Sequence, residues 1–226
     1  MLKAGEEALK SSASSEALHY YQRAIELYIK KHGDDVDKKR IAEMEENIAN
    51  AFLNKGLFVE TVDYFDRASI NRGEKVQKNI LLIFIKIITS LITLISNLYL
   101  PSIGKKKIPT ELDNQDMNRA FKVASALATI DLQRCFLNNL EAIKQTFKYD
   151  ISKSQVYFNM QCGGSVLFSV SGISFSIARK ILEHTNKNID KKNKGIHLRL
   201  YTFAEQVFNF LAGNWYGEIN EDMVNT

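Results

Sequence analysis

The residues of this chain that could do chemistry lack the spacing that a reactive or metal site needs. The three lysines after Gly104 have neither the upstream glycine nor the following hydroxyl residue of a phosphate-binding loop. A calcium loop starting at Asp35 and ending at Glu46 would place Arg40 where glycine must make the sharp turn. The sequence therefore predicts neither a phosphate site nor a calcium site.

The histidines, cysteines and paired carboxylates give no ligand set and no activated nucleophile. The histidines are scattered, and none has a second ligand three or four residues away: His19, His32, His184 and His197. Cys135 and Cys162 lie among apolar neighbours and are expected to be small buried hydrophobic residues. Adjacent carboxylates such as Glu45 and Glu46 point to different helix faces, which indicates solvated charges. We expect no catalytic residue, no metal and no cofactor; an enzyme would need a deep pocket joining His197 or Cys162 to a carboxylate.

Composition favours an all-α protein of the cytoplasm. The 226 residues include only two prolines and two cysteines, too few cysteines for a disulfide-stapled secreted domain. The formal charge of +4 is small, and basic residues alternate with acidic ones, which argues against nucleic acid as a partner. The N-terminus lacks the basic start and apolar run of a signal peptide.

Two segments of the N-terminal third repeat the same spacing of small and aromatic residues 44 positions apart. The first comprises Gly5, Ala8, Ser12, Ala17, Tyr21 and Ala24; the second comprises Ala49, Phe52, Gly56, Thr61, Phe65 and Ala68. This pattern is typical of tetratricopeptide hairpins, in which small residues let two antiparallel helices approach and aromatics fill the gap between hairpins. Gly56 is expected at the turn inside the second hairpin. A plain amphipathic hairpin without repeat kinship is the alternative.

Helical spacing continues to the C-terminus, so the predicted fold is an all-α stack of hairpins, an α-solenoid. We expect helices at 112–146 with a break near Asp131, and at 154–171, 173–184 and 196–212. The predicted organisation is hairpins at 1–79, a buried apolar helix at 80–100, a connector at 101–116 and further hairpins at 117–226. Because the chain stops shortly after Trp215, before a second helix could complete the last hairpin, we expect it to be a segment of a longer polypeptide.

The apolar segment 80–100 is long enough to cross a bilayer, at about 1.5 Å per residue. Its polar residues lie on one helical face: Lys86, Thr89, Ser90, Thr93 and Asn97. A single span in lipid has no need of such a stripe, whereas a helix between protein neighbours does. We therefore expect burial in a soluble array, ended by Pro101, with membrane anchoring as the alternative.

The stretches Gly56–Asn79 and Asn97–Ile143 resemble the C-terminal helical region of large signalling ATPases of the STAND type. The marks of this resemblance are Gly73-Glu74-Lys75, the long apolar helix and Pro109-Thr110-Glu111-Leu112, and it spans roughly residues 15 to 215. In that family a protein-kinase or nucleotide-cyclase domain precedes the ATPase, and tetratricopeptide-like helices follow it. The resemblance implies a soluble regulatory segment whose catalytic and ATP-binding residues lie outside this chain.

The predicted function is non-enzymatic: a scaffold that binds a protein, a peptide or a neighbouring domain of the same polypeptide. In a tetratricopeptide hairpin the first helix lines the binding groove, and the candidate groove residues here are Glu43, Glu46, Asn50, Leu53 and Asn54. The two glutamates argue against a clamp for C-terminal carboxylates. A basic or mixed partner is therefore expected.

Overall fold

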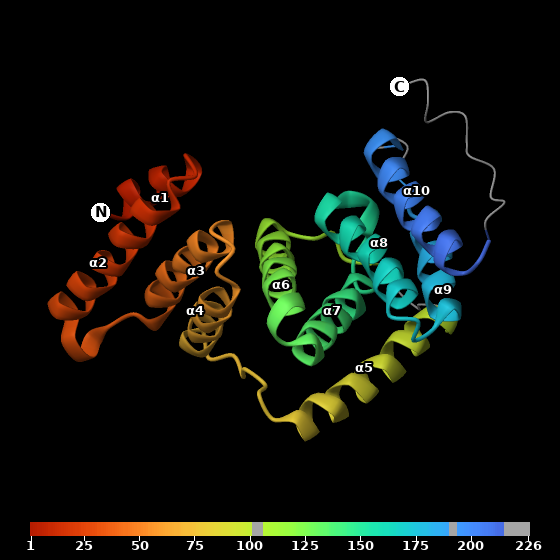
Figure 1. The fold of residues 1–226 in the computed structure, drawn as a ribbon, viewed down its shortest axis with the longest axis horizontal. Helices are drawn as coiled ribbons and strands as arrows, with labels where there is room; N and C mark the ends of the chain where they lie inside the picture. The colour runs from red at the N-terminus through yellow and green to blue at the C-terminus, as the bar shows by residue number, and fades with distance from the viewer. Residues whose placement is uncertain (101–105, 190–193, 215–226) are drawn as a thin grey trace. The chain divides into compact units, whose positions relative to one another are not determined.

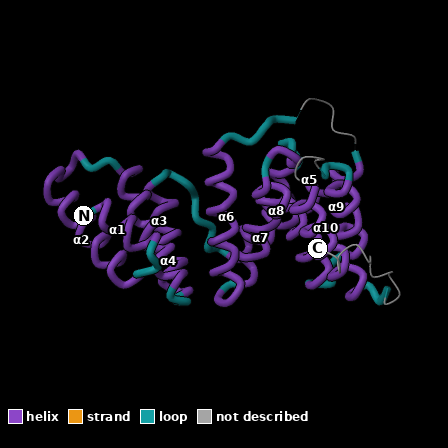
Figure 2. Tube along the Cα trace, turned by 90° about the horizontal axis from the view of Figure 1, so that it is seen from above, coloured by secondary structure: helices purple, strands orange, loops and turns teal. Residues whose placement is uncertain are grey.

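The structure is a computed structural model that describes residues 1–100, 106–189 and 194–214. Within these ranges the chain forms ten α-helices and no β-strand, and it is 81% helical (Figures 1 and 2). One isolated β-bridge joins Lys107 to Tyr149. The all-α prediction is confirmed.

The chain divides into two compact units, which we describe separately. Unit 1 comprises residues 1–87 and 119–138, and unit 2 comprises 88–118 and 139–226. Four helices lie wholly in unit 1: α1 (Leu2–Lys10), α2 (Ser14–His32), α3 (Lys38–Asn54) and α4 (Phe58–Asn71). Three lie wholly in unit 2: α8 (Gln155–Val170), α9 (Phe175–Asn186) and α10 (Lys194–Leu211). Three contribute residues to both: α5 (Ile80–Tyr99), α6 (Glu111–Ile130) and α7 (Leu132–Thr146).

The two N-terminal hairpins have equivalent turns. Gly56, between α3 and α4, has a φ of 71°, so the predicted turn is confirmed at a position that favours glycine. Ser12, which lies 44 residues earlier between α1 and α2, has a φ of 61°. The small residues that follow the turns, Ala17 and Thr61, are both fully buried. The local geometry of the two hairpins therefore matches the repeat in the sequence.

Unit 1 holds its helices together with two apolar clusters. The first cluster joins α1, α2 and α3 around the buried Tyr21 and Ile48, and the second joins Val62 of α4 to Ala126 and Leu127 of α6. In Figure 1, α1 with α2 and α3 with α4 lie side by side as pairs. Apolar burial at about 25 cal/mol per Å² is the main stabilising contribution to such a stack.

Glu45 is buried and Glu46 is half-buried and paired, whereas the sequence-based expectation was two solvated charges. Glu45 is buried and accepts a 2.7 Å hydrogen bond from the Asn71 amide, with the Arg67 Nε 3.6 Å away. Glu46 forms an ion pair with Arg72. Adjacent residues of α3 do point in different directions, but here both directions meet polar groups at the C-terminal end of α4.

Unit 2 packs around α8, which buries Gln161 among its neighbours. Gln161 is fully buried; its amide donates to the Thr146 hydroxyl at 2.8 Å, and its carbonyl oxygen lies 3.2 Å from the Thr185 hydroxyl. On the same helix Phe158 stacks on the His197 ring, with 4.0 Å between centroids. Figure 1 shows α8, α9 and α10 side by side, as their contacts require. The buried Gln161 side chain therefore ties α8 to α7 and α9 through hydrogen bonds, which helps to fix the register of these helices.

The two adjacent glycines of α8, Gly163 and Gly164, have opposite environments. A Cβ added at Gly164 would lie 2.9 Å from Cγ1 and Cδ1 of the buried Ile143, whereas one added at Gly163 would meet no atom within 4 Å. Only Gly164 is therefore needed for the close approach of α7 and α8.

This difference predicts opposite effects of the same substitution. Gly163→Ala should raise the free energy of unfolding by about 0.5–1 kcal/mol, because alanine favours the helix. Gly164→Ala should lower it by about 1–2 kcal/mol, because overpacking against Ile143 outweighs that gain. Urea unfolding followed by circular dichroism would measure both, and an equal change in the two variants would contradict the packing described here.

Helix α6 begins at Glu111, one residue before the predicted helix at 112–146 and inside the predicted connector at 101–116. Thr110 and Asp113 form a reciprocal cap, in which the Thr110 amide donates to the Asp113 carboxylate at 2.8 Å and the Asp113 amide donates to the Thr110 hydroxyl at 3.2 Å. The expected connector at 101–116 is therefore wrong for its last six residues, which are helical. The rest of the predicted helices and the break at Asp131 agree with the structure, while Pro101 and Trp215 lie outside the described residues.

The apolar segment forms the long helix α5, but its expected burial is not found. Only 17% of its most apolar 18-residue window is buried, and by length and composition alone the helix could cross a membrane. Within α5, Ile83, Ser90 and Leu94 are the buried residues, and most of the other isoleucines and leucines are exposed. The buried-helix prediction is corrected to a helix that packs by one face and leaves a large apolar surface open.

Candidate functional site

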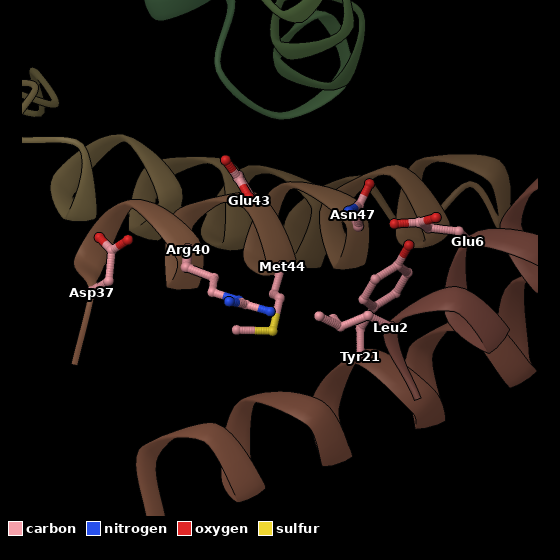
Figure 3. Close-up of a pocket in the computed structure, with 8 residues that line it drawn as sticks. All are labelled: Leu2, Glu6, Tyr21, Asp37, Arg40, Glu43, Met44 and Asn47. Atoms are coloured by element: carbon pink, nitrogen blue, oxygen red, sulfur yellow. The ribbon is translucent and has the colours of Figure 1, made fainter. Parts of the chain in front are cut away.

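A pocket of about 260 Å³ opens among α1, α2 and α3 of unit 1 (Figure 3). It combines apolar, uncharged polar and charged side chains: Leu2, Glu6, Tyr21, Asp37, Arg40, Glu43, Met44 and Asn47. Tyr21 and Met44 are buried and form its floor, while the four charged side chains are exposed and form its rim. The site is therefore a small apolar floor with one hydroxyl, surrounded by charges.

The hairpin geometry of α1 and α2 fixes the tyrosine of this pocket. Gly5 of α1 lies against the ring, since a Cβ at this position would be 3.0 Å from Cε2 and Cζ of Tyr21. On the other side, α3 is started by Asp37, whose carboxylate accepts from the Lys39 amide at 2.9 Å. Asp37 is thus the N-cap of the helix that carries the remaining lining residues.

The Tyr21 hydroxyl is the unusual group of the site. The side chain is 1% exposed, and the hydroxyl has no hydrogen-bond partner within the described part of the chain. Burial, with the negative charge of Glu6 as a second cause, raises the pKa of Tyr21 to about 12. Figure 3 shows the hydroxyl directed toward Glu6 and Asn47. A buried hydroxyl without a partner costs roughly 1–3 kcal/mol, so a group that binds here gains by satisfying it.

The charge around the hydroxyl is mainly negative. Among the residues that the structure describes, neither Glu6 nor Glu43 forms an ion pair. The Arg40 guanidinium lies 5.3 Å from the centroid of the Tyr28 ring, a distance that allows a cation–π contact. The carboxylates therefore remain available to a cation from outside, whereas the arginine already has an aromatic neighbour.

The predicted groove residues do not form one continuous surface. Glu43 lines the pocket, whereas Glu46 is paired with Arg72. Leu53 packs against the apolar cluster between α4, α6 and α7. The Asn50 side-chain oxygen is buried without a hydrogen bond to any described residue, and Asn54 is exposed at the end of α3. Of the five, only Glu43 therefore shares a site with other candidate binding residues.

The residues that were considered for catalysis are placed in the core or at the surface. Burial raises the pKa of the Cys162 thiol to about 12, so the nucleophilic thiolate is disfavoured. The buried His197 ring is stacked on Phe158, while His19 and His32 are exposed on α2. No group of three or more His, Cys, Asp or Glu residues that could hold a metal occurs within residues 1–100, 106–189 and 194–214.

Sequence reasoning missed most of this pocket. Tyr21 was expected only as an aromatic that fills the gap between hairpins, and Glu6 was not among the candidate binding residues. The available signal was the repeat itself: Tyr21 aligns with Phe65 of the second hairpin, so the first hairpin has a hydroxyl where the second has none. A hydroxyl at a core position needs a hydrogen-bond partner from the protein, from water or from a ligand, so this difference could have indicated a pocket.

Comparisons with protein-family models, with curated proteins and with solved structures find no match to this chain.

Proposed function

We propose that this chain is a non-enzymatic scaffold of tetratricopeptide-like hairpins, stacked as an α-solenoid, whose pocket on α1, α2 and α3 binds a lysine or arginine side chain of a protein partner. The matching turns and small residues of the two N-terminal hairpins support the repeat architecture. Peptide recognition in a groove between helices is a usual role of such arrays.

The buried, unpartnered Tyr21 hydroxyl, in a pocket that Glu6 and Glu43 also line, is the observation that carries this proposal. An ammonium or guanidinium group in the pocket would donate to Glu6, Glu43 and the phenolic oxygen. Its aliphatic stem would lie against Leu2 and Met44, as long basic side chains bury their methylene groups on apolar surface. A carboxylate ligand would meet two like charges and is disfavoured.

The test uses short capped peptides that differ only at their central residue. We expect a peptide of glycine and serine with a central lysine or arginine to shift the backbone NMR signals of residues near Glu6, Tyr21 and Asn47. The same peptide with norleucine, which keeps the stem and lacks the charge, should bind at least tenfold more weakly. Equal binding of the norleucine and lysine peptides would contradict the cation site.

Variants of the chain separate a pocket role from a structural one. Glu43→Gln should weaken the lysine peptide about tenfold, whereas Glu46→Gln should leave its affinity unchanged, because Glu46 faces Arg72 and not the pocket. Tyr21→Phe should also weaken binding, yet raise the free energy of unfolding by about 1 kcal/mol, since it removes an unsatisfied buried hydroxyl. If Glu46→Gln weakened binding and Glu43→Gln did not, the pocket would be excluded as the binding site and the groove predicted from the sequence would be favoured.

The resemblance to signalling ATPases supports a wider context for the same module. In this proposal the array belongs to a cytoplasmic regulatory polypeptide, and the basic segment that it binds lies in a partner or in a neighbouring domain. Any nucleotide chemistry would then be performed by domains other than the residues of this chain. Sequencing the coding region on either side would test this context, because an adjacent ATPase, kinase or cyclase domain is expected there.

A further inference from the structure

The open face of α5 carries a regular row of large apolar side chains. These six residues, which we name the α5 seam, are Leu81, Ile85, Ile88, Ile92, Ile95 and Tyr99. Their separations alternate between four and three residues, the spacing of a coiled-coil contact line. All six are between 41% and 68% exposed. Because α5 is one uninterrupted helix, this alignment is a property of the helix itself.

The opposite face of α5 is already occupied by its own chain. The Ser90 hydroxyl is hydrogen-bonded to the Glu141 carboxylate, and the Lys144 Nζ lies 3.3 Å from the same hydroxyl. Leu94, one turn further on, is fully buried. The helix is therefore held with a fixed face inward, and the seam is presented outward.

A second stripe beside the seam limits what can cover it. Lys86, Thr89, Thr93 and Ser96 are exposed and follow one another at intervals of three, four and three residues, which places them on one flank of the helix. Lipid around a membrane-spanning helix would cover this polar flank as well, at a high cost for Lys86. A single partner helix covers only one stripe and leaves the flank in water. The observations therefore favour a helix over a bilayer.

We infer that the α5 seam joins two copies of this chain through antiparallel packing of α5 against α5. The separations of the seam residues read four, three, four, three and four in either direction along the helix. A second, antiparallel α5 aligned so that the two residues 90 face each other therefore places Leu81 opposite Tyr99, Ile85 opposite Ile95 and Ile88 opposite Ile92. This arrangement opposes the two helix dipoles favourably. It also separates the two Lys86 positions by about 12 Å along the axis, whereas a parallel pair would place them side by side.

The oligomeric state in solution tests the inference. We expect sedimentation equilibrium of the full chain to give twice the monomer mass of 25.8 kDa. Ile88→Glu with Ile92→Glu should give the monomer, because each charge would face apolar side chains of the other copy. The matched control is Val59→Glu with Ile70→Glu, at exposed apolar positions of α4, and it should remain dimeric. A wild-type monomer, or dissociation of the control pair as well, would overturn the inference.

Cysteine cross-linking tests the direction of packing. A mixture of Ile85→Cys and Ile95→Cys chains should form an intermolecular disulfide under mild oxidation, while Ile85→Cys alone should not, since its two copies would lie about 15 Å apart along the axis. The native Cys135 and Cys162 are buried, so their background should be low. Cross-linking of Ile85→Cys alone would show parallel packing and overturn the antiparallel arrangement. A wild-type chain that is monomeric and floats with vesicles of phosphatidylcholine and phosphatidylserine would assign the seam to a bilayer.

Discussion

Replacing Asp66 by alanine should lower the free energy of unfolding by about 3 kcal/mol. The Asp66 carboxylate is buried in α4 and accepts a 2.6 Å hydrogen bond from the Arg134 guanidinium of α7. The Lys78 ammonium lies 3.1 Å from its other oxygen. The Arg134 side chain is only 15% exposed, so removal of the carboxylate leaves a largely buried cation without its partner, which is strongly destabilising. Urea unfolding followed by circular dichroism measures the loss.

The control for this experiment lies one turn earlier in the same helix. Asp63 is 62% exposed and 3.7 Å from Arg67, so Asp63→Ala should change the free energy of unfolding by less than about 0.5 kcal/mol. Replacing both buried partners with apolar residues, as in Asp66→Leu with Arg134→Met, should recover most of the loss, since neither charge then remains buried. If Asp66→Ala were as mild as Asp63→Ala, the pair would be solvated and not structural.

Acidification should destabilise the protein through His184, by about 2 kcal/mol between pH 6.5 and pH 4. Burial, followed by the charges of Lys106 and Lys187, lowers the pKa of His184 to about 4. Its Nδ1 lies 2.9 Å from the Gln161 side-chain oxygen and its Nε2 lies 2.9 Å from the Lys106 Nζ. The neutral ring donates to the first and accepts from the second, so a further proton would face the lysine cation.

The direction of this effect follows from where the proton binds. Between pH 6.5 and pH 4 the unfolded chain takes up a proton at this histidine and the folded chain does not, so stability is greatest above pH 6.5 and falls as the pH drops. A tenfold change in proton affinity corresponds to about 1.4 kcal/mol, and partial solvent access of the ring reduces the full difference. The measurement is the free energy of unfolding as a function of pH.

His184→Gln should flatten this pH dependence, because glutamine cannot take up the proton. His19→Gln serves as the matched control, since His19 is exposed on α2 and should leave the slope unchanged. A slope that persists in His184→Gln would assign the acid sensitivity to other groups. Destabilisation of His184→Gln at all pH values alike would indicate a hydrogen-bonding role without a linked proton.

The helices and their turns were predictable because they depend on nearby residues. Apolar spacing located the helices after residue 79 within a few residues, and a left-handed conformation was foreseeable at Gly56, where the chain must reverse. The reciprocal cap of Thr110 and Asp113 is also local, and overlooking it extended the predicted connector into the first turns of α6. Where the geometry depends on one short stretch of residues, the sequence alone was enough to predict it.

The burial of α5 and the pocket depend on distant groups, and they were not predictable in the same way. The polar stripe of α5 was expected to need polar neighbours, but the Thr93 hydroxyl bonds the Thr89 carbonyl of its own helix at 2.9 Å. Ser90 of that stripe does reach another helix, at Glu141 of α7. The ion pair of Glu46 with Arg72, the C-cap residue of α4, likewise joins distant parts of the sequence, so the spacing along α3 alone does not predict it.

The chain contains two cysteines, and the structure places one in each compact unit, Cys135 in unit 1 and Cys162 in unit 2. Both thiols are buried, so a water-soluble thiol reagent reaches each of them only when the surrounding helices open. Mass spectrometry of the two cysteine-containing peptides would give the labelling rate of each thiol, and therefore the opening rate of each unit, without any substitution in the chain. Equal labelling rates would indicate that the two units unfold together, and different rates would indicate that they unfold separately.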